Sequence, residues 1–375
     1  MIRISDKSLC CGCTACVAVC PAQCIVFRRD REGFDYPVAN PDLCIHCGKC
    51  ESVCPVLNPL EPDGPMASYA VRIPEFVEGS SSGGVFPALA RNVIAAGGVV
   101  YGAVFNPDMT VGHMAAETMS EVGRMRGSKY VQSDLYDSFG EIKEYLKQGR
   151  PVLFSGTPCQ VAGLNRFLGK KHDSLLTVEL ACHGVPSPGV WEKYLDALSR
   201  KYGGMVSEVK FRDKSRSWRN YDFTVSIGDT RVSVPHHEDP FMALFLQNMT
   251  LRPSCYECPS KGGRSHADII LADLWNMVSV PDIQDDDKGM SLAVANTLNG
   301  KVALQALNVE FIDVDLVSAR QKNSGFENSA HCPERRSEFF SGLHSAKDMI
   351  AYLSGFVMKK NLRMMLSNLK RRIIK

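Results

Sequence analysis

The order of apolar and polar positions predicts an α/β domain from residue 67 onward. Short apolar runs predict strands at 68–73, 99–105, 152–154 and 175–181, whereas apolar residues at helical spacing predict helices at 85–96, 135–148 and 161–168. Three further strand-like runs, at 206–211, 223–227 and 231–234, lie close enough in sequence to form an antiparallel ribbon. This alternation is typical of an α/β fold, and the ribbon favours a mixed sheet over a purely parallel one.

Ahead of this domain, one cysteine pattern occurs twice. Residues 10–21 and 44–55 both read Cys-x2-Cys-x2-Cys-x3-Cys-Pro, which is the spacing of one half of a bacterial ferredoxin that holds two 4Fe-4S clusters. The fourth cysteine of each half ligates the cluster of the other half, so the predicted ligand sets are crossed. They are Cys10, Cys13, Cys16 and Cys54 for one cluster, and Cys44, Cys47, Cys50 and Cys20 for the other.

The repeated pattern predicts a dicluster ferredoxin domain that carries single electrons. Two other interpretations are a zinc site, which prefers one tetrahedral set of four ligands, and a disulfide framework, which needs an oxidising compartment. Eight cysteines in two proline-terminated groups fit neither well. Cys11 and Cys24 fall outside the repeat, and we interpret them as buried small apolar residues, with a fifth ligand or a redox-active thiol as the alternative.

The chain divides into four expected segments. Residues 1–60 are the ferredoxin domain, 61–66 a proline-rich linker, 67–345 the mixed-sheet domain and 346–375 a basic amphipathic tail. The tail pattern suits contact with an anionic membrane surface or an acidic partner, and the alternative is a solvated terminal helix.

Composition and charge narrow the class of protein. Lys and Arg number 43 against 41 Asp and Glu, so the formal net charge of +2 gives no indication of nucleic-acid binding. The first residues lack the apolar segment of a signal peptide, and no run of about 18 apolar residues indicates a transmembrane helix. Fifteen cysteines without an export signal favour the reducing cytoplasm and metal ligation over disulfides.

Four of the remaining cysteines form a second candidate site. Cys159 and Cys182 each follow an apolar strand, so both are expected at one edge of the sheet, where a loop carrying Cys255 and Cys258 can complete a four-thiolate site. The spacing alone leaves three alternatives open, namely zinc, a disulfide redox pair at Cys255 and Cys258, and a nucleophile at Cys182 beside His183.

A set of motifs extends this second site. In chain order they are Gly79-Ser80-Ser81-Ser82-Gly83-Gly84, Gly127-Ser128-Lys129-Tyr130, Gly156-Thr157-Pro158-Cys159-Gln160, Cys182-His183-Gly184, and Cys255-x2-Cys258 ahead of Ala267-Asp268-Ile269. Up to about residue 330 this set resembles the coenzyme F420 hydrogenase/dehydrogenase beta-subunit family, many members of which carry a fused N-terminal dicluster ferredoxin. The resemblance implies a domain that binds FAD and a third 4Fe-4S cluster, the latter held by Cys159, Cys182, Cys255 and Cys258. The chain departs from the family where Gly-Asp-Phe-Trp-Gly is replaced by Ala272-Asp273-Leu274-Trp275-Asn276, which leaves the substrate open.

The resemblance also indicates where a flavin would bind. Because the serine and glycine loop precedes a predicted helix, Ser82 is expected to cap that helix while the glycines expose N–H groups to a phosphate. Lys129 supplies a cation for a phosphate or for the negative charge of a reduced flavin. The alternatives are an ordinary serine cap and a surface lysine. The expected cofactor-binding residues are Ser81, Ser82, Gly83, Gly84, Ser128, Lys129 and Tyr130.

These features predict an oxidoreductase. No Gly-x-Gly-x-x-Gly lies between a strand and a helix and no Gly-x4-Gly-Lys-Ser/Thr loop is present, so nicotinamide and nucleotide triphosphate chemistry find no support. The leading interpretation is an iron-sulfur flavoprotein that passes electrons from a ferredoxin-like donor through 4Fe-4S clusters to FAD and an organic two-electron acceptor, with deazaflavin coenzyme F420 as one candidate. His183 is the expected catalytic proton donor, unless it only supports the neighbouring cluster ligand. The alternatives are a non-catalytic electron-transfer subunit of a larger dehydrogenase or hydrogenase complex, and a zinc-stabilised binding protein.

Overall fold

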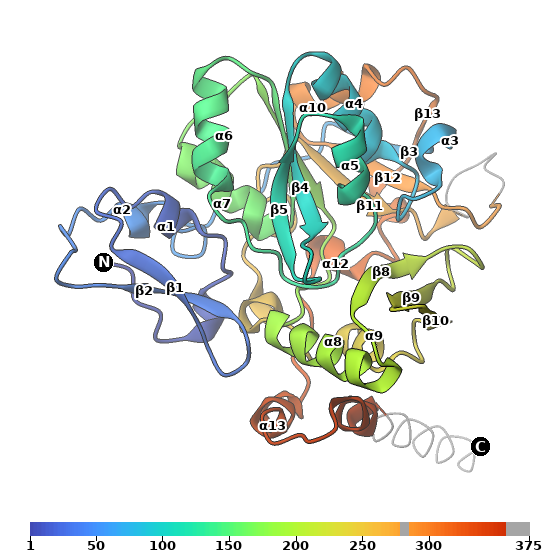
Figure 1. Ribbon diagram of the computed structural model, residues 1–375. Helices are drawn as coiled ribbons and strands as arrows, with labels where there is room; N and C mark the ends of the chain where they lie inside the picture. The colour runs from blue at the N-terminus through green and yellow to red at the C-terminus, as the bar shows by residue number, and fades with distance from the viewer. Residues whose placement is uncertain (278–284, 358–375) are drawn as a thin grey trace, which may run out of the picture.

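The computed structural model describes residues 1–277 and 285–357, and its centre is an eight-stranded sheet in the order β13-β3-β12-β11-β7-β6-β4-β5 (Figure 1). Strands β4, β6, β7 and β11 are parallel, whereas β12 is antiparallel to both β11 and β3, and β5 is antiparallel to β4. The sheet is therefore mixed, and the predicted α/β fold class is confirmed. The strand bounds are β3 Ala67–Val71, β4 Val99–Phe105, β5 Val111–Ala116, β6 Val152–Gly156, β7 Leu175–Leu180, β11 Ile269–Asp273, β12 Ser291–Ala295 and β13 Phe311–Asp313.

Helices cover both faces of the sheet, which explains why its central strands are continuously apolar. Along β6, Val152 and Phe154 belong to one core and Leu153 to the other, because successive strand residues point to opposite faces. One face is covered by α4 (Val85–Ala95), α5 (Met119–Met125) and α10 (Leu298–Gln305), and the other by α6 (Ser138–Lys147) and α7 (Pro158–Leu168).

The predicted antiparallel ribbon forms a separate three-stranded sheet. Its strands are β8 (Val206–Asp213), β9 (Asp222–Ile227) and β10 (Thr230–Pro235), in the order β10-β9-β8. Helices α8 (Pro188–Tyr202) and α9 (Pro240–Leu246) cover it and bury an aromatic core that includes Trp191, Phe211 and Phe241. This small sheet faces the carboxyl ends of the parallel strands.

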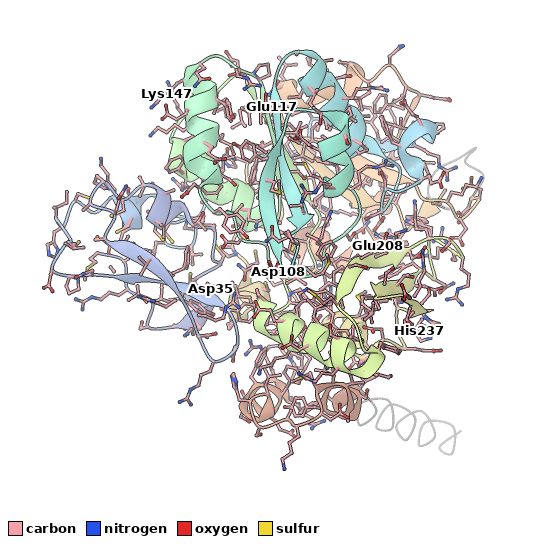
Figure 2. All side chains as sticks on the ribbon, in the orientation of Figure 1. Asp35, Asp108, Glu117, Lys147, Glu208 and His237 are labelled. Carbon is pink, nitrogen blue, oxygen red and sulfur yellow. The ribbon has the colours of Figure 1, made fainter. Side chains whose placement is uncertain are left out.

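The N-terminal ferredoxin module contains a two-stranded antiparallel sheet, β1 (Ile25–Arg29) with β2 (Asp35–Ala39), and the short helices η1 (Lys7–Leu9), α1 (Ala15–Ala18) and α2 (Lys49–Ser52). It lies beside α7 and α8 (Figure 1), and Figure 2 shows Asp35 at the side of the module that faces the main domain. The turn between β1 and β2 inserts Phe34, which is fully buried, against Phe340 of α13 (Arg336–Gly342), with ring centroids 6.5 Å apart.

The remaining described helices are α3 (Pro74–Val77), η2 (Pro253–Glu257), α11 (Leu316–Ala319) and α12 (Ser324–Glu327). Residues 349–357 are also helical, and Leu353 and Phe356 pack in the same core as α13. The rest of the predicted basic tail, 358–375, lies outside the described residues. No helix in the described part of the chain is long and apolar enough to cross a membrane.

Candidate functional site

The eight repeated cysteines line two small cavities, and the fourth cysteine of each repeat lies with the other repeat. Cys10, Cys13, Cys16 and Cys54 line one cavity, whereas Cys44, Cys47, Cys50 and Cys20 line the other. The structure therefore brings together the crossed sets that the spacing predicts. We call the first the proximal site, because it faces the main domain, and the second the distal site.

The two cysteines outside the repeat also lie at these cavities. Both are buried, as expected, and Cys24 Sγ is 3.5 Å from Cys20 Sγ at the distal site. Cys11 lines the proximal site and packs in one core with Cys13 and Cys159. Cys11 therefore stands between the proximal site and the second cysteine group.

The four cysteines of the second group lie near one another in the structure. A capping box of Thr157 and Gln160 starts α7 and places Cys159 in its first turn, and Cys182 directly follows β7. Cys255 and Cys258 lie in and just after η2. The thiol of Cys182 is within electrostatic reach of the other three, although they come from segments up to 99 residues apart in sequence. We call this group the third thiol site.

The chemistry of these thiols fits metal ligation. Burial raises the pKa of Cys255 to about 12 and that of Cys258 to about 11, so neither is a thiolate nucleophile at neutral pH unless a cation binds. The buried ammonium of Lys261 acts in the opposite direction on the pKa of Cys182 and Cys258, because a positive charge favours the thiolate. A bound metal deprotonates a coordinating thiol outright, and four neighbouring, half-buried cysteines suit an iron-sulfur cluster.

No group of three or more His, Cys, Asp or Glu side chains within residues 1–277 and 285–357 is arranged around a single metal ion. A cubane cluster spreads its four thiolates over a larger body than one ion does, so this finding concerns single-ion sites.

A cavity of about 420 Å³ adjoins the third thiol site at the carboxyl ends of β7 and β11. In open α/β sheets, ligands bind outside the carboxyl ends of the strands. Cys182 and His183 line this cavity, and so do six of the seven predicted cofactor-binding residues, which are Ser81, Ser82, Gly84, Ser128, Lys129 and Tyr130.

The seventh residue, Gly83, does not line the cavity, and its N–H donates to Ser291 Oγ at 2.9 Å. A Cβ at this position would come within 2.4 Å of Val71 O, so only glycine fits. The prediction that Ser82 caps α4 is wrong. Gly84 occupies the N-cap with a φ of 87°, and the Ser82 hydroxyl donates to Met290 O at 2.7 Å.

Lys129 lies at the cavity, but its ammonium is already hydrogen-bonded. It donates to the carbonyl oxygens of Arg124 and Arg126 at 2.9 Å and of Gly127 at 3.3 Å. Burial lowers the pKa of Lys129 to about 7, whereas these carbonyls at the end of α5 favour the charged form. Its clearest role is to fix the 124–128 loop that forms one wall of the cavity.

Four side chains with unpartnered nitrogen atoms also line the cavity. Within the described residues, the buried nitrogens without a hydrogen-bond partner are His113 Nδ1, Arg126 Nε, His183 Nε2, and Arg212 Nε and Nη2. Buried donors and acceptors are nearly always paired, so these atoms indicate that a polar ligand completes the site. Burial lowers the pKa of His113 to about 4 and also lowers that of His183, so both imidazoles are neutral at pH 7. Neither His113 nor Arg212 falls in a motif, so sequence reasoning missed both.

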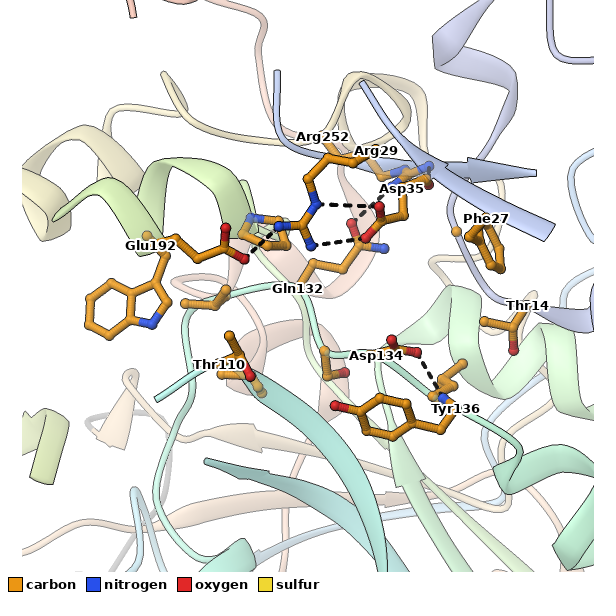
Figure 3. Close-up of a pocket in the computed structure, with 17 residues that line it drawn as sticks. Thr14, Phe27, Arg29, Asp35, Thr110, Gln132, Asp134, Tyr136, Glu192 and Arg252 are labelled. Carbon is orange, nitrogen blue, oxygen red and sulfur yellow. Dashed lines mark hydrogen bonds and ion pairs between the residues drawn. The ribbon is translucent and has the colours of Figure 1, made fainter. Parts of the chain in front are cut away.

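Arg252 connects the ferredoxin module to the loop of the third thiol site, and it too lies outside the motifs. It is 1% exposed and donates to Cys10 O at 2.7 Å, Gln132 Oε1 at 2.9 Å and Asp35 O at 3.0 Å. Its Nη2 lies 3.6 Å from Cys10 Sγ. Figure 3 shows Arg252 and Gln132 beside Arg29 and Asp35 in a cavity of about 180 Å³ between the module and the main domain.

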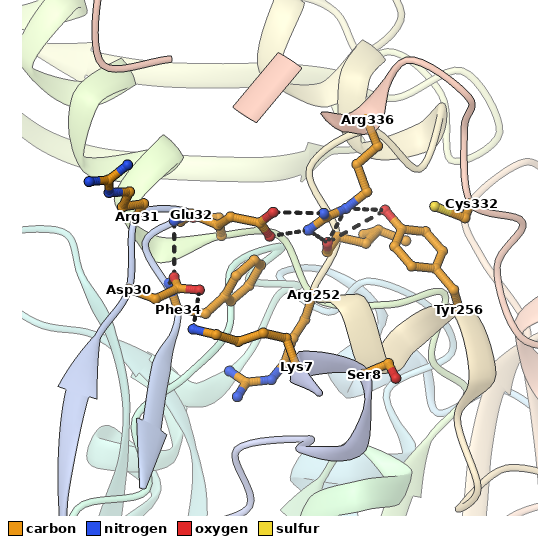
Figure 4. A network of polar contacts seen from close by, with 12 residues as sticks. Lys7, Ser8, Asp30, Arg31, Glu32, Phe34, Arg252, Tyr256, Cys332 and Arg336 are labelled. Atoms are coloured by element: carbon orange, nitrogen blue, oxygen red, sulfur yellow. Dashed lines mark hydrogen bonds and ion pairs between the residues drawn. The ribbon is translucent and has the colours of Figure 1, made fainter. Parts of the chain in front are cut away.

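A second buried arginine fixes the other side of this junction. Arg336 of α13 holds Glu32 through Nη1 at 2.9 Å and through Nη2, and it also donates to Tyr256 Oη at 3.0 Å and Leu251 O at 2.9 Å (Figure 4). Because Tyr256 follows Cys255, these contacts place the proximal site and the third thiol site in one rigid setting.

Two family models match parts of this chain. Residues 9–58 match the family model of the 4Fe-4S dicluster domain, and residues 149–318 match the model of the C terminus of the coenzyme F420 hydrogenase/dehydrogenase beta subunit. A chain in a structure of the F420-reducing NiFe hydrogenase complex from Methanosarcina barkeri superposes with a TM-score of 0.46 at 17% identity, over 69% of this chain and 85% of that chain. No curated protein gives a significant match.

The cysteine sites and the two family matches define an iron-sulfur electron-transfer protein. More particularly, residues 149–318 match the C-terminal domain of the coenzyme F420 hydrogenase/dehydrogenase beta-subunit family, and residues 9–58 form a 4Fe-4S dicluster ferredoxin module.

Proposed function

We propose that this protein is a cytoplasmic iron-sulfur flavoprotein oxidoreductase that passes electrons between a ferredoxin-like partner and an organic two-electron acceptor. Bound clusters would supply one-electron transfer, and bound FAD would supply the pairing of two electrons. The acceptor belongs to the class of molecules that take a hydride equivalent, of which deazaflavin coenzyme F420 is one candidate.

The observation that carries this proposal is the continuous series of thiol sites ending at the cavity. Cys50 of the distal site and Cys16 of the proximal site pack in one core, and the proximal site contacts α7, where a Cβ at Gly163 would lie 2.9 Å from Cys13 Sγ. Cys11 then packs with Cys159 of the third thiol site, and Cys182 of that site lines the cavity.

The residues around the cavity suit a bound flavin. The loop 80–84 and the start of α4 form one wall, where helix N–H groups attract a phosphate. At the opposite side, Cys182 and His183 bring the third thiol site to the cavity. The His183 ring stands edge-on to Phe245, with centroids 5.1 Å apart, so it is held in one orientation. We propose His183 as the residue that exchanges a proton with the acceptor, since its neutral imidazole can take up a proton there and return it.

Apolar side chains at the distal site favour a docking role there. Leu43 is 57% exposed and Ile45 is 66% exposed beside Cys44, while Cys47 is itself exposed. An exposed apolar patch next to a redox centre is typical of a transient contact with an electron-transfer partner. The same patch also favours the second candidate function, a non-catalytic electron-transfer subunit within a larger dehydrogenase or hydrogenase complex.

One experiment tests the proposal and separates these two candidates. The purified chain, loaded anaerobically with iron, sulfide and FAD, is reduced with dithionite and mixed with candidate acceptors, including coenzyme F420. The oxidoreductase assignment predicts catalytic turnover by the chain alone, and a loss of turnover with His183→Phe at unchanged iron and flavin content. Rapid oxidation of the clusters by an electron-transfer protein, without turnover of any organic acceptor, would favour the second candidate.

A further inference from the structure

Arg212 is a buried cation that is only partly satisfied by the protein. It lies in β8, its side chain is 5% exposed, and Nη1 donates to Asp273 Oδ2 at 2.7 Å. Nε and Nη2 have no partner in the part of the chain that the structure describes, and neither does Asp273 Oδ1. Removing a guanidinium from water without replacing its hydrogen bonds is costly, so these donors indicate a missing acceptor.

The two unpartnered nitrogens lie on one edge of the guanidinium. Nε–H and one N–H of Nη2 point in nearly parallel directions, which makes this edge a fork for two oxygen atoms of one anion. Two other arginines of this chain use the same edge. Arg335 holds Glu338 through Nε at 2.7 Å and Nη2 at 2.6 Å, and Arg29 holds Asp35 through Nε at 3.3 Å and Nη2 at 3.1 Å. In Arg212, no carboxylate of residues 1–277 or 285–357 occupies this edge.

The guanidinium is also held in position. Tyr221 and Trp275 lie at the guanidinium, with ring centroids 4.9 Å and 5.3 Å from Cζ, and Trp275 stacks on Trp218 at 4.5 Å. Arg212, Tyr221, Trp275 and Asp273 all line the large cavity. Such a preorganised fork loses little conformational entropy when it binds an anion.

The charge of the cavity selects an anionic ligand. Its lining contains four cationic side chains, Arg126, Lys129, Arg212 and Lys322, against the single carboxylate of Asp273. Lys129 donates to three carbonyls, and Arg126 donates through Nη2 to Phe76 O and Glu78 O and has one buried unpartnered nitrogen, Nε. Within the described residues, Arg212 is the cation of this lining with two buried unpartnered nitrogens.

Contacts within the fold connect Arg212 to the 80–84 loop, where a phosphate is expected to bind. Its partner Asp273 pairs with Ser291 across β11 and β12, and Ser291 accepts from the N–H of Gly83 in the 80–84 loop. Trp218 donates to Ser81 O at 3.1 Å, and Lys214 donates to Ser82 O at 3.5 Å, so the segment that follows β8 rests on the same loop. The small sheet therefore connects Arg212 to the 80–84 loop, where the sequence analysis expects a phosphate to bind.

We propose that Arg212 is the anion-binding residue of this cavity and that its free edge takes a phosphate group of the molecule held there. Asp273 orients the guanidinium and partly balances its charge. This assignment rests on the proposed function and deepens it, because the phosphate can belong to the flavin or to the organic acceptor.

The test compares Arg212→Gln with wild type in cluster-loaded, flavin-depleted protein, using fluorescence quenching by FAD and by riboflavin, which lacks phosphate. If the phosphate belongs to FAD, Arg212→Gln weakens FAD binding roughly 10- to 150-fold, the range for a charge-assisted hydrogen bond, and changes riboflavin binding by less than about 3-fold. The matched control is Arg216→Gln, an exposed arginine four residues away that pairs with Asp222, and it should bind both flavins as wild type does.

A second measurement covers the acceptor. If the phosphate belongs to the acceptor, Arg212→Gln binds both flavins normally, while inorganic pyrophosphate raises the thermal midpoint of FAD-loaded wild type and not that of the variant. Arg212→Gln leaves the carboxylate of Asp273 without its partner, which can destabilise the fold. The double variant Arg212→Gln with Asp273→Asn removes that charge as well, and its binding of FAD, riboflavin and pyrophosphate should match that of Arg212→Gln.

Normal binding of FAD, riboflavin and pyrophosphate by both variants would overturn the proposal. If wild type binds neither flavin while pyrophosphate still distinguishes wild type from Arg212→Gln, the anion site stands and the flavin assignment fails.

Discussion

Replacing Arg252 with methionine is expected to loosen the ferredoxin module from the main domain. Methionine has a similar length and fills the apolar space beside Tyr36, whose ring centroid is 4.3 Å from Arg252 Cζ. It cannot donate hydrogen bonds, so the change removes the donors and keeps much of the packing.

The magnitude follows from the acceptors that lose their partner. Cys10 O, Asp35 O and Gln132 Oε1 each accept from Arg252 in a site that is 1% exposed. A buried acceptor left without a donor costs about 1–3 kcal/mol, and removing one member of a buried charged network costs about 3–5 kcal/mol. We therefore expect a loss of about 3–5 kcal/mol in the free energy of unfolding. Arg252→Lys keeps the charge but not the planar set of donors, so its free energy of unfolding should lie between those of wild type and Arg252→Met.

The assay is anaerobic urea denaturation of cluster-loaded protein, followed by far-UV circular dichroism and by the visible absorbance of the clusters. The free-energy change is the shift in midpoint multiplied by the measured slope. Arg231→Met serves as the control, because Arg231 is 56% exposed and makes one contact with Asp213 at 3.2 Å, so a change of less than about 0.5 kcal/mol is expected. The reasoning fails if Arg252→Met and Arg231→Met have the same midpoint.

Three further predictions follow from the thiol sites and the cavity. Gly163→Ala places a Cβ 2.8 Å from Cys13 Cβ, so it should lower bound iron by about four atoms per chain, the content of one cubane. The control is Gly140→Ala, which has no atom within 4 Å of its Cβ and should not change the iron content. Cys11→Ala should keep all bound iron, because Cys11 lies outside the repeated pattern, and a loss of iron would make it a ligand. Burial lowers the pKa of His113 from 6.5 to about 4, so the unfolded state binds the proton more readily and the stability of the protein falls as pH drops below 6.5. Between about pH 6.5 and 5, the thermal midpoint of His113→Gln should therefore fall less than that of wild type. Equal slopes of midpoint against pH in the two proteins would refute this.

Local patterns in the sequence predicted much of the fold and of the thiol sites. The cysteine repeats were informative because cluster ligation depends on residue spacing, which a sequence displays directly. The central strands were found because both of their faces are buried, as for Val152 and Phe154 on one side of the sheet and Leu153 on the other. The helix expected at 135–148 begins only at Ser138, after Tyr136 adopts a positive φ of 44° that no apolar pattern reveals.

The parts that were not predicted depend on contacts between distant segments. Ser82 resembles a helix cap, but its hydroxyl is hydrogen-bonded to Met290 O, 208 residues away. Arg212 meets Asp273 across 61 residues, and Arg252 meets Cys10 across 242. The sequence points to Lys129 and not to Arg212 as a ligand-binding cation, because Lys129 lies in a motif. In the structure, however, the Lys129 ammonium donates to backbone carbonyls. Sequence spacing carries no information about such pairings.

We propose that the chain holds three 4Fe-4S clusters, the third of them at Cys159, Cys182, Cys255 and Cys258. The most direct test is quantitation of iron and acid-labile sulfide in anaerobically reconstituted wild type and Cys182→Ser. The account predicts about 12 iron and 12 sulfide per chain in wild type and about 8 of each in the variant, since one four-iron cluster is lost. About 8 of each in both proteins, or zinc in wild type that the variant lacks, would contradict it.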